Sequence, residues 1–596
     1  MISRLVRIAV IEKDSCKPTK CGGPCRKYCP IVRTGQEAIY FVNEKEPPVI
    51  NEYLCSGCCI CVKKCPFNAI SVVNLPDDLE ERVFHRYGVN AFKLYGFPAL
   101  SPGSVTGILG ENGIGKSTIL KIIGGLIKPN LGRVGEEVST DEILASLRGN
   151  VSFVLIEKIF KGKLKCIYKP QYLDEIPRRI GERKAGEVLE KIDERGIFEK
   201  VVEELDLNKV LDNRVDTLSG GELQRLAIGA ACMRDGDVYL FDEPSSFLDV
   251  KQRLKAADLI ISLKEENKVI AVVEHDLTLL DYLADYIIVM YGQPSVYGIV
   301  SQVLSARVGI NSYLEGYIRQ ENIRFRKENI RFHTHVRNSE ILQIKMFEWP
   351  AIEVSLENFR LNAEGGSICV GEVIGIAGPN GIGKTTMLRE LLKSFIGSSP
   401  MSEGEIIKKI GYKPQYVSGL FRGVVSDILK EAYGGEIPEL LQSELIKPLK
   451  LDRLSDRLAE TLSGGELQAL AIAVALLKDS PIYFLDEPCA YLDVEQRLAV
   501  IRAIRHTIVA KKSSAFVVEH DIAALDFLSD RLILIEGEPS VFGQASPPMM
   551  VAEGMNKLLK YLDVTIRREP ENLRPRINKK DSKIDRLQRA QEKYYY

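Results

Sequence analysis

The octapeptide Thr-Leu-Ser-Gly-Gly-Glu-Leu-Gln occurs twice in this chain of 596 residues, beginning at Thr217 and at Thr461. In both copies an Asp-Glu pair starts 23 residues after the serine, from Ser219 to Asp242 and from Ser463 to Asp486. A repeated octapeptide at a repeated distance from a second motif indicates a duplicated domain. The chain is also too long for one hydrophobic core, so we expect three or four domains, two of which are copies of each other.

A phosphate-binding loop precedes each octapeptide. Both loops read Gly-x-Asn-Gly-Ile-Gly-Lys-Ser/Thr, at residues 110–117 and 378–385, and the first directly follows the apolar run 105–109. The glycines let backbone N–H groups turn toward phosphates, the lysine supplies a cation, and the hydroxyl ligates Mg²⁺. The residues that we expect to bind ATP are Asn112, Gly113, Gly115, Lys116, Ser117 and Thr118 in one loop, and Asn380, Gly381, Gly383, Lys384, Thr385 and Thr386 in the other.

Each Asp-Glu pair ends a run typical of a buried strand, and its two carboxylates have different predicted roles. Asp242 and Asp486 should hold Mg²⁺ together with Ser117 and Thr385. Glu243 and Glu487 should act as general bases that polarise the attacking water. A strand with a charged end would explain one pair, but it would not explain why the pair recurs at the same distance from the octapeptide.

Nine of the 13 cysteines lie between residues 16 and 65. The second half of this segment reads Cys-x2-Cys-x2-Cys-x3-Cys-Pro from Cys55, the pattern of a two-cluster ferredoxin in which the fourth cysteine ligates the other cluster. A looser run that also ends in Cys-Pro begins at Cys16. The crossed pattern predicts two 4Fe-4S clusters, one held by Cys16, Cys21, Cys25 and Cys65, and the other by Cys29, Cys55, Cys58 and Cys61.

Two alternatives remain open for these cysteines. Thiolate groups also bind structural zinc, so a pair of zinc sites would use the same residues. Cys59 is left over and is either a packing residue or a spare ligand. A disulfide scaffold does not fit for two reasons. Its cysteines would not be clustered in this way, and a cytosolic chain would not keep the disulfides oxidised.

The two copies differ in length at one place. From the loop lysine to a Lys-Pro-Gln motif there are 55 residues in the first copy (116 to 171) and 31 in the second (384 to 415), while from that glutamine to the octapeptide serine there are 48 in both. The first copy therefore carries 24 extra residues between about 125 and 168. The stretches 140–148 and 157–165 predict two short helices, the second of them basic; an insertion without function is the alternative.

The 80 Lys and Arg nearly cancel the 81 Asp and Glu, so nucleic acid could be bound only through local patches. Residues 319–337 hold six basic and two acidic residues with Phe325 and Phe332 among them, and residues 566–596 hold ten basic and five acidic residues. Such tracts suit an RNA backbone with exposed bases, and a solvated linker is the alternative. No apolar run reaches the roughly 18 residues that span a bilayer, and the first residues carry charge, so we expect a soluble cytoplasmic protein.

The order of phosphate-binding loop, octapeptide and acidic pair resembles the ATP-binding-cassette (ABC) ATPases. The resemblance implies that the octapeptide is their signature motif, which completes the nucleotide site of the facing cassette through Ser219, Gly221, Ser463 and Gly465. It implies that Gln171 and Gln415 contact Mg²⁺ and sense the γ-phosphate, that His275 and His520 reach the γ-phosphate, and that Asp249 and Asp493 lie in D-loops between the cassettes. Tyr87, Phe92 and Phe359 lie where the family stacks an aromatic ring on adenine; core packing is the alternative.

The whole chain resembles the E subfamily of ABC proteins, the RNase L inhibitor or ribosome-recycling family, because it adds the cysteine domain, an insertion in the first cassette and Gly-Tyr-Ile-Arg-x-Glu-Asn-Ile-Arg at residues 316–324. The expected architecture is α/β and multidomain: a ferredoxin-like domain (1–75), a first nucleotide-binding domain (76–292) with its insertion (125–168), a hinge (293–345), a second nucleotide-binding domain (346–545) and a C-terminal hinge segment (546–596).

The resemblance implies an ATPase that binds the small ribosomal subunit and its rRNA beside a release factor or a homologue for stalled ribosomes, and that splits ribosomes when its cassettes close. It implies a monomer whose cassettes pair within one chain. An ATP-gated electron carrier and a soluble transporter subunit are the rival functions. A DNA-repair ATPase is excluded, because the 103 residues from Lys116 to Ser219 leave no room for a long coiled coil.

Overall fold

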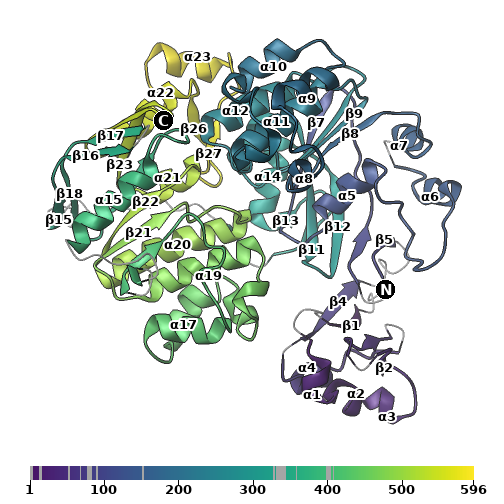
Figure 1. The fold of residues 1–596 in the computed structure, drawn as a ribbon. Helices are drawn as coiled ribbons and strands as arrows, with labels where there is room; N and C mark the ends of the chain where they lie inside the picture. Colours follow the sequence, from purple (N-terminus) through teal and green to yellow (C-terminus); the bar gives the residue numbers. More distant parts are fainter. Residues whose placement is uncertain are drawn as a thin grey trace.

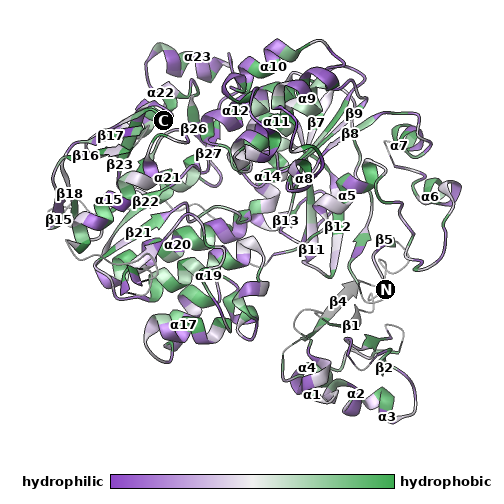
Figure 2. Ribbon diagram, in the orientation of Figure 1, coloured by the Kyte–Doolittle hydropathy of each residue, from purple (hydrophilic) through white to green (hydrophobic). Residues whose placement is uncertain are grey.

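The computed structural model describes residues 5–11, 16–43, 45–51, 54–67, 69–76, 83–88, 91–150, 153–326, 329–330, 344–356, 359–397, 405–406 and 409–596. Figure 1 shows two α/β units side by side, coloured blue to teal and green to yellow, and a small purple N-terminal domain beside them. Apolar residues concentrate on the central strands of both large units, where Figure 2 is mostly green. The expected multidomain α/β architecture, with two similar large units and a small N-terminal domain, is confirmed.

The N-terminal domain is built from short elements around its cysteines. β1 (Leu5–Ile11) pairs antiparallel with β4 (Ile70–Pro76), and β2 (Ile39–Tyr40) pairs with β3 (Val49–Ile50). The helices are α1 (Pro18–Cys21), α2 (Pro24–Lys27), α3 (Pro30–Arg33) and α4 (Ile60–Lys64). The first three begin with proline, whose fixed φ and missing N–H suit the first position of a helix.

The first cassette contains an eight-stranded sheet in the order β5-β6-β12-β11-β7-β10-β9-β8. Its strands are β5 (Val83–Arg86), β6 (Lys93–Tyr95), β7 (Ser104–Leu109), β8 (Cys166–Lys169), β9 (Val238–Asp242), β10 (Val269–Val273), β11 (Tyr286–Gln293) and β12 (Tyr297–Ser305). The central strands β7, β9 and β10 are parallel and buried along their whole length, which explains their continuous apolar sequences.

The second cassette repeats this sheet strand for strand, in the order β16-β17-β24-β23-β19-β22-β21-β20. Its strands are β16 (Ile352–Leu356), β17 (Phe359–Ala363), β19 (Val373–Ala377), β20 (Gly411–Lys413), β21 (Ile482–Asp486), β22 (Ser514–Val518), β23 (Arg531–Glu538) and β24 (Phe542–Ala545), and β25 (Met549–Met550) pairs with β23. β15 (Lys345–Trp349) and β18 (Gly366–Cys369) form a separate pair. The duplication predicted from the motifs therefore extends to the whole sheet.

Four pairs of equivalent helices carry the motifs. α5 (Lys116–Ile123) and α15 (Lys384–Ile396) follow the phosphate-binding loops, and α11 (Gly220–Met233) and α19 (Gly464–Leu477) follow the signature serines. α12 (Val250–Ile261) and α20 (Val494–Lys511) follow the D-loops, and α13 (Leu277–Leu283) and α21 (Ile522–Leu528) follow the histidines. The remaining helices between β8 and α11 are α8 (Glu175–Ile180), α9 (Ala185–Ile192) and α10 (Phe198–Glu204); between β20 and α19 they are α17 (Val425–Tyr433) and α18 (Glu439–Leu441).

The insertion contains two helices, as expected, but the second begins and ends earlier than predicted. α6 (Thr140–Ser146) is capped by Ser139, whereas α7 (Phe153–Phe160) begins four residues before the predicted start at residue 157. Ile156 and Ile159 of α7 are buried, so its apolar face determines its position. The expectation of a basic second helix was wrong, because Lys161, Lys163 and Lys165 follow the helix instead of lying in it.

The sheet of the first cassette continues past the expected domain boundary at residue 292. β12 pairs antiparallel with β11 as far as Ser305, and α14 (Ala306–Glu315) packs against this hairpin. The first unit therefore extends beyond residue 292, and the pair β13 (Tyr317–Ile318) and β14 (Ile323–Arg324) follows it. Phe332 and the whole of the basic tract after residue 330 lie outside the described residues.

The C-terminal segment joins the two cassettes. It consists of α22 (Val551–Tyr561), the antiparallel pair β26 (Ile566–Arg568) and β27 (Pro575–Ile577), and α23 (Lys583–Ala590). Arg574 and Arg576 pair with Asp281 of α13 in the first cassette, while Arg568 and the hydroxyl of Tyr596 contact Asp526 of α21 in the second.

These contacts change the interpretation of the basic tract. Asp281 and Asp526 occupy the same position, the fifth residue, of two equivalent helices. The arginines that contact them are engaged inside the protein, so they are not an open surface for RNA phosphates. The interpretation of residues 566–596 as a basic tract for an RNA backbone therefore does not hold for these arginines.

Candidate functional site

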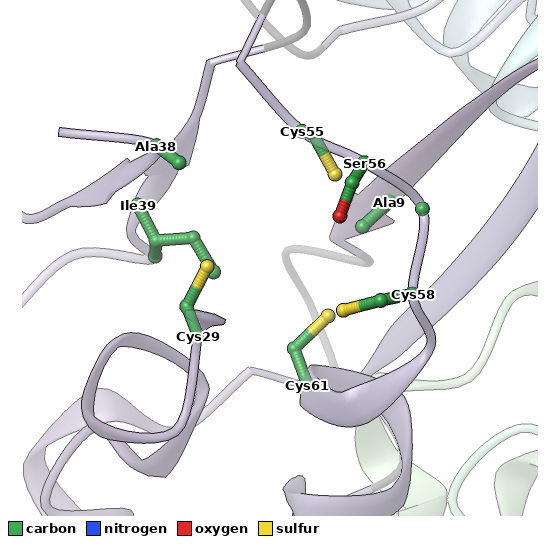
Figure 3. Close-up of a pocket in the computed structure, with 9 residues that line it drawn as sticks. Ala9, Cys29, Ala38, Ile39, Cys55, Ser56, Cys58 and Cys61 are labelled. Atoms are coloured by element: carbon green, nitrogen blue, oxygen red, sulfur yellow. The ribbon is translucent and has the colours of Figure 1, made fainter. Parts of the chain in front are cut away.

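Two cavities in the N-terminal domain are each lined by four cysteines. One is lined by Cys16, Cys21, Cys25 and Cys65, and the other by Cys29, Cys55, Cys58 and Cys61. Figure 3 shows Cys29 reaching the second cavity from one side while the other three sulfur atoms lie opposite. These are the two crossed sets that the sequence pattern predicts. Cys59 lines neither cavity, has a left-handed backbone (φ 61°) and precedes α4.

The donor set fits an iron-sulfur cluster in each cavity. Among the described residues, no three His, Cys, Asp or Glu side chains are arranged around a point that could hold a single metal ion. The sulfur atoms instead lie along the cavity walls. Burial and the neighbouring thiols raise the pKa of Cys16 to about 11. Burial, and to a lesser extent the charge of the Cys55 thiolate, raises the pKa of Cys61 to about 12. Since iron binds the thiolate, cluster assembly must displace these protons.

The phosphate-binding loops hold their lysines close to the backbone. Nζ of Lys116 donates to the carbonyl oxygens of Gly110 (2.9 Å) and Glu111 (2.8 Å), and Nζ of Lys384 donates to that of Pro379 (2.6 Å). Both lysines are buried at the N-termini of α5 and α15, where backbone N–H groups point outward. A phosphate group would give each ammonium a stronger, charged partner.

The aspartates of the acidic pairs are buried and incompletely hydrogen-bonded. Oδ1 of Asp242 and both carboxylate oxygens of Asp486 have no hydrogen-bond partner among the described residues. Burial raises the pKa of Asp242, and it raises that of Asp486 to about 6 although Thr385 and the nearby lysines oppose the shift. Buried carboxylate oxygens without partners, beside the hydroxyls of the phosphate-binding loops, fit Mg²⁺ ligands.

The neighbouring glutamates each contact the expected histidine and glutamine. Oε1 of Glu243 lies 3.3 Å from Nε2 of His275 and accepts from Nε2 of Gln171 at 2.7 Å. Glu487 has the same contacts, at 3.3 Å from His520 and 2.8 Å from Gln415. Burial acts to raise the pKa of both glutamates, but the histidine contact and the nearby lysine outweigh it and hold the pKa at about 2.

Both glutamates also have a left-handed backbone, with φ of 45° at Glu243 and 49° at Glu487. Such a backbone is costly for a residue with a Cβ and often occurs at functional sites. The carboxylates stay ionised at neutral pH, as orientation of an attacking water requires.

Each D-loop aspartate contacts the phosphate-binding loop of the other cassette. Oδ2 of Asp249 accepts from the backbone N–H of Asn380 at 2.9 Å, and Oδ2 of Asp493 accepts from that of Asn112 at 3.3 Å. Phe247 and Tyr491 meet between the D-loops, with ring centroids 5.8 Å apart. The two cassettes therefore face each other with reciprocal contacts, as the resemblance implies.

The signature serines are helix caps and lie exposed. Ser219 and Ser463 each form a capping box, with Glu222 and with Glu466. Apart from the N–H groups that the capping boxes use, the backbone N–H groups at the start of these helices are available to an anion. A Cβ added at Gly464 would meet no atom within 4 Å, so the space in front of this signature is open. Gly221 and Gly465 instead lie close to the D-loop carbonyls of Phe247 and Tyr491, 3.0 Å from where a Cβ would sit.

The predicted aromatic residues divide into two groups. Phe92 and Phe359 pack beneath the phosphate-binding loops, so close that a Cβ at Gly115 or Gly383 would lie 2.6 or 2.7 Å from their rings. This supports core packing for both. Tyr87 is 54% exposed, and its hydroxyl lies 3.1 Å from Oγ1 of Thr118, so it is placed to meet a base. Leu356 faces Phe359 across its strand pair where Tyr87 faces Phe92, so the second site has no tyrosine at this position.

The ionic contacts that involve the second cassette and its neighbours were not predicted. Nζ of Lys450 lies 3.1 Å from Oε2 of Glu111 in the first phosphate-binding loop, and Arg326 of the hinge lies 2.7 Å from Glu495. The second phosphate-binding loop has Pro379 where the first has Glu111, so it lacks this acidic partner. Comparing the two loops could have revealed the difference, but not the lysine that contacts the glutamate.

Three family models match the chain. The model described as "ABC transporter" matches residues 98–246 and 362–490, the model of a possible Fer4-like domain in RNase L inhibitor matches 6–37, and that of a 4Fe-4S binding domain matches 48–71. The protein is therefore an ATPase that uses ATP and Mg²⁺ and carries 4Fe-4S clusters, which rules against the zinc alternative. No helix among the described residues is long and apolar enough to cross a membrane.

Full-length relatives show the same organisation. The chain is 49% identical to an uncharacterized ABC transporter ATP-binding protein of Methanocaldococcus jannaschii, over 99% of this chain and 98% of the relative. It is 43% identical to translation initiation factor RLI1 of Saccharomyces cerevisiae, again over 99% and 98%.

Two solved structures are similar over most of the chain. One is a model of ribosome-bound archaeal Pelota and ABCE1 (TM-score 0.90, 48% identity, all of both chains). The other is an archaeal ribosome recycling factor, aABCE1, in complex with the ribosomal stalk protein aP1 (TM-score 0.81, 48% identity, 87% of this chain and 99% of that one). With its twin cassettes, crossed cysteine sets and full-length similarity to these proteins, the chain belongs to the E subfamily of ABC proteins, the RNase L inhibitor family.

Proposed function

We propose that this protein is a ribosome-recycling ATPase of the cytoplasm, which binds the small ribosomal subunit and its rRNA beside a release factor or its homologue and splits ribosomes into subunits. The main support is the full-length similarity to a chain solved as ribosome-bound ABCE1 together with Pelota. We further propose that it works as a monomer, because the D-loop contacts already pair its own two cassettes.

Closure of the cassettes drives the splitting. In the open arrangement each nucleotide is bound by one phosphate-binding loop; closing adds Ser463 to the site of Lys116 and Ser219 to that of Lys384. Because ATP gains contacts only in the closed state, its binding favours closure. Glu243 and Glu487 orient the water in each site, and His275 and His520 hold these carboxylates and reach the γ-phosphate. Hydrolysis removes the contact with the γ-phosphate, and the cassettes reopen.

The residue assignments complete the proposal. Asp242, Asp486, the loop hydroxyls of Ser117 and Thr385, and the glutamines Gln171 and Gln415 hold Mg²⁺, which would supply charge neutralisation at the phosphates. Tyr87 stacks on the adenine in the first site. The eight cysteines that line the two cavities ligate the clusters.

Sedimentation with ribosomes tests the function. Purified holo-protein is mixed with cognate ribosomes, a release-factor homologue and a non-hydrolysable ATP analogue, and is separated on a sucrose gradient. We expect the protein to migrate with the small subunit and the peak of whole ribosomes to shrink. Lys116→Ala/Lys384→Ala, which cannot hold the phosphates, is the control. If neither the migration of the protein nor the peak of whole ribosomes changed with nucleotide, ribosome recycling would be excluded and the electron-carrier alternative favoured.

A further inference from the structure

Two buried lysines lie beside the acidic pairs and have no assigned role. Lys169 ends β8 and Lys413 ends β20, the edge strands next to β9 and β21. Lys169 is 2% exposed and Lys413 is fully buried. Both belong to the Lys-Pro-Gln motifs, in which sequence reasoning assigned a role only to the glutamine.

Both ammonium groups donate to the backbone of the acidic pair. Nζ of Lys169 lies 3.0 Å from the carbonyl oxygen of Asp242 and 3.2 Å from that of Glu243. Nζ of Lys413 lies 2.6 Å from the carbonyl oxygen of Asp486 and 3.0 Å from that of Glu487. The same two contacts therefore occur in both cassettes.

The carbonyl groups that they hold belong to the strained part of the site. Each glutamate has a left-handed backbone, which costs on the order of 1–3 kcal/mol and persists only if its surroundings enforce it. A second donor acts from another side, since Nε2 of Gln224 donates to the carbonyl oxygen of Glu243 at 2.8 Å, and Nε2 of Gln468 to that of Glu487 at 2.7 Å. The backbone of each glutamate is thus fixed between a strand-end lysine and a helix glutamine.

Fixing this backbone determines where the carboxylate points. Its Oε1 contacts the histidine and the glutamine, which come after the two strands on either side. A small change in the backbone angles of the strained glutamate would separate these groups. Because a misplacement of about 1 Å can cost about 100-fold in rate, the backbone donors matter for the chemistry.

We propose that Lys169 and Lys413 are positioning residues for ATP hydrolysis: each holds the left-handed backbone of the adjacent glutamate through two carbonyl groups, and so aims its carboxylate at the attacking water. The simpler alternative is that each lysine only balances the buried carboxylates around it, Asp242, Glu243 and Glu274 in the first cassette. In that case its loss would weaken the fold but would not act through the glutamate.

Replacement of both lysines by methionine tests the proposal, because methionine is similar in length and apolar but donates nothing. In holo Lys169→Met/Lys413→Met, we expect kcat to fall about 10- to 100-fold, about 1.4–2.7 kcal/mol at 1.36 kcal/mol per tenfold. This is a part of the 10²- to 10⁴-fold that a general base contributes. KM and the Kd for a fluorescent ATP analogue should change less than about twofold, because the lysines do not touch the phosphate-binding loop. Lys165→Met is the matched control, since Lys165 precedes the same strand but forms a surface pair with Glu194.

Combination with Glu243→Gln/Glu487→Gln separates positioning from charge balance. If the lysines act through the glutamates, the quadruple variant hydrolyses ATP no more slowly than the Glu→Gln pair. An additional 10-fold loss in the quadruple variant, or a parental kcat in the Met pair, would overturn the proposal. If the Met pair does not fold, the same measurement is made on Lys169→Arg/Lys413→Arg, whose larger head group keeps the charge. Here we expect a lower kcat at parental KM, and a parental kcat would overturn the proposal.

Discussion

The C-terminal hairpin should depend strongly on one carboxylate, Asp281. This side chain is 1% exposed and pairs with Arg574 at 3.1 Å and with Arg576 at 2.5 and 2.9 Å. In Asp281→Asn, Arg576 keeps Glu569 at 2.6 Å, but Arg574, itself 1% exposed, loses its carboxylate partner and keeps only neutral acceptors such as the carbonyl oxygen of Leu277 at 3.4 Å. Removing one partner of a buried pair leaves an uncompensated charge and costs about 3–5 kcal/mol.

This energy should appear in the local opening of the hairpin. Amide hydrogen exchange reports such openings, and about 1.4 kcal/mol corresponds to a tenfold change. We therefore expect the protected amides of β26 and β27 to exchange roughly 100- to 4,000-fold faster in Asp281→Asn, while the central strands of both sheets keep their protection.

Asp563→Asn is the control for this measurement. Asp563 also pairs with an arginine of the segment, Arg589, but it is 65% exposed, and exposed pairs contribute only about 0–1 kcal/mol. In Asp563→Asn, the exchange of the same amides of β26 and β27 should rise less than about fivefold by the same conversion. Parental exchange of the hairpin in Asp281→Asn would refute the argument that the buried ion pairs hold this segment between the cassettes.

Three further predictions follow from the sites. Glu243→Gln/Glu487→Gln should bind ATP but hydrolyse it at least about 100-fold more slowly, and should accumulate in the closed, subunit-bound state on sucrose gradients; hydrolysis at the parental rate would disprove the assigned base. By iron analysis, Cys21→Ser, Cys65→Ser and the double variant Cys21→Ser/Cys65→Ser should each lose half of the iron, because both cysteines are assigned to one cluster. Cys58→Ser/Cys65→Ser should lose all of the iron, because these two cysteines are assigned to different clusters. If this last variant keeps half of its iron, the crossed ligand sets are wrong. Burial raises the pKa of Asp486 to about 6, so this carboxyl is protonated below pH 6 and must lose its proton to bind Mg²⁺. The apparent Kd of the second site should therefore rise about tenfold per pH unit below 6 and stay level above it. Titration of Mg²⁺-dependent ATP binding at pH 5 and 7.5 tests this, and equal affinity at the two pH values would contradict it.

The sequence revealed the parts of the protein that are determined by local chemistry. The strand-loop-helix of each phosphate-binding loop, the buried strands that end at Asp242 and Asp486, and the crossed cysteine sets all depend on residue type and spacing. The position of α7 was predicted wrongly because the predicted stretch followed the basic residues, whereas burial of the apolar face with Ile156 and Ile159 determines where the helix lies.

Contacts between distant segments could not be predicted from one sequence. Nothing near Lys450 indicates that it meets Glu111, 339 residues away. The arginines of the C-terminal segment were interpreted as a free basic surface because composition counts charges without their partners. The aspartates that neutralise them lie on α13 and α21, and only the folded chain brings them together.

The left-handed backbone of Glu243 and Glu487 has a consequence for how variants of this protein would be selected. Glycine at these positions would relieve the steric cost of a Cβ, but it would also remove the carboxylate that the histidine, the glutamine and the nearby lysine hold. In a library enriched only for survival at high temperature, the frequency of glycine at the two positions should therefore report which of these opposed contributions is larger, without any assay of ATP hydrolysis.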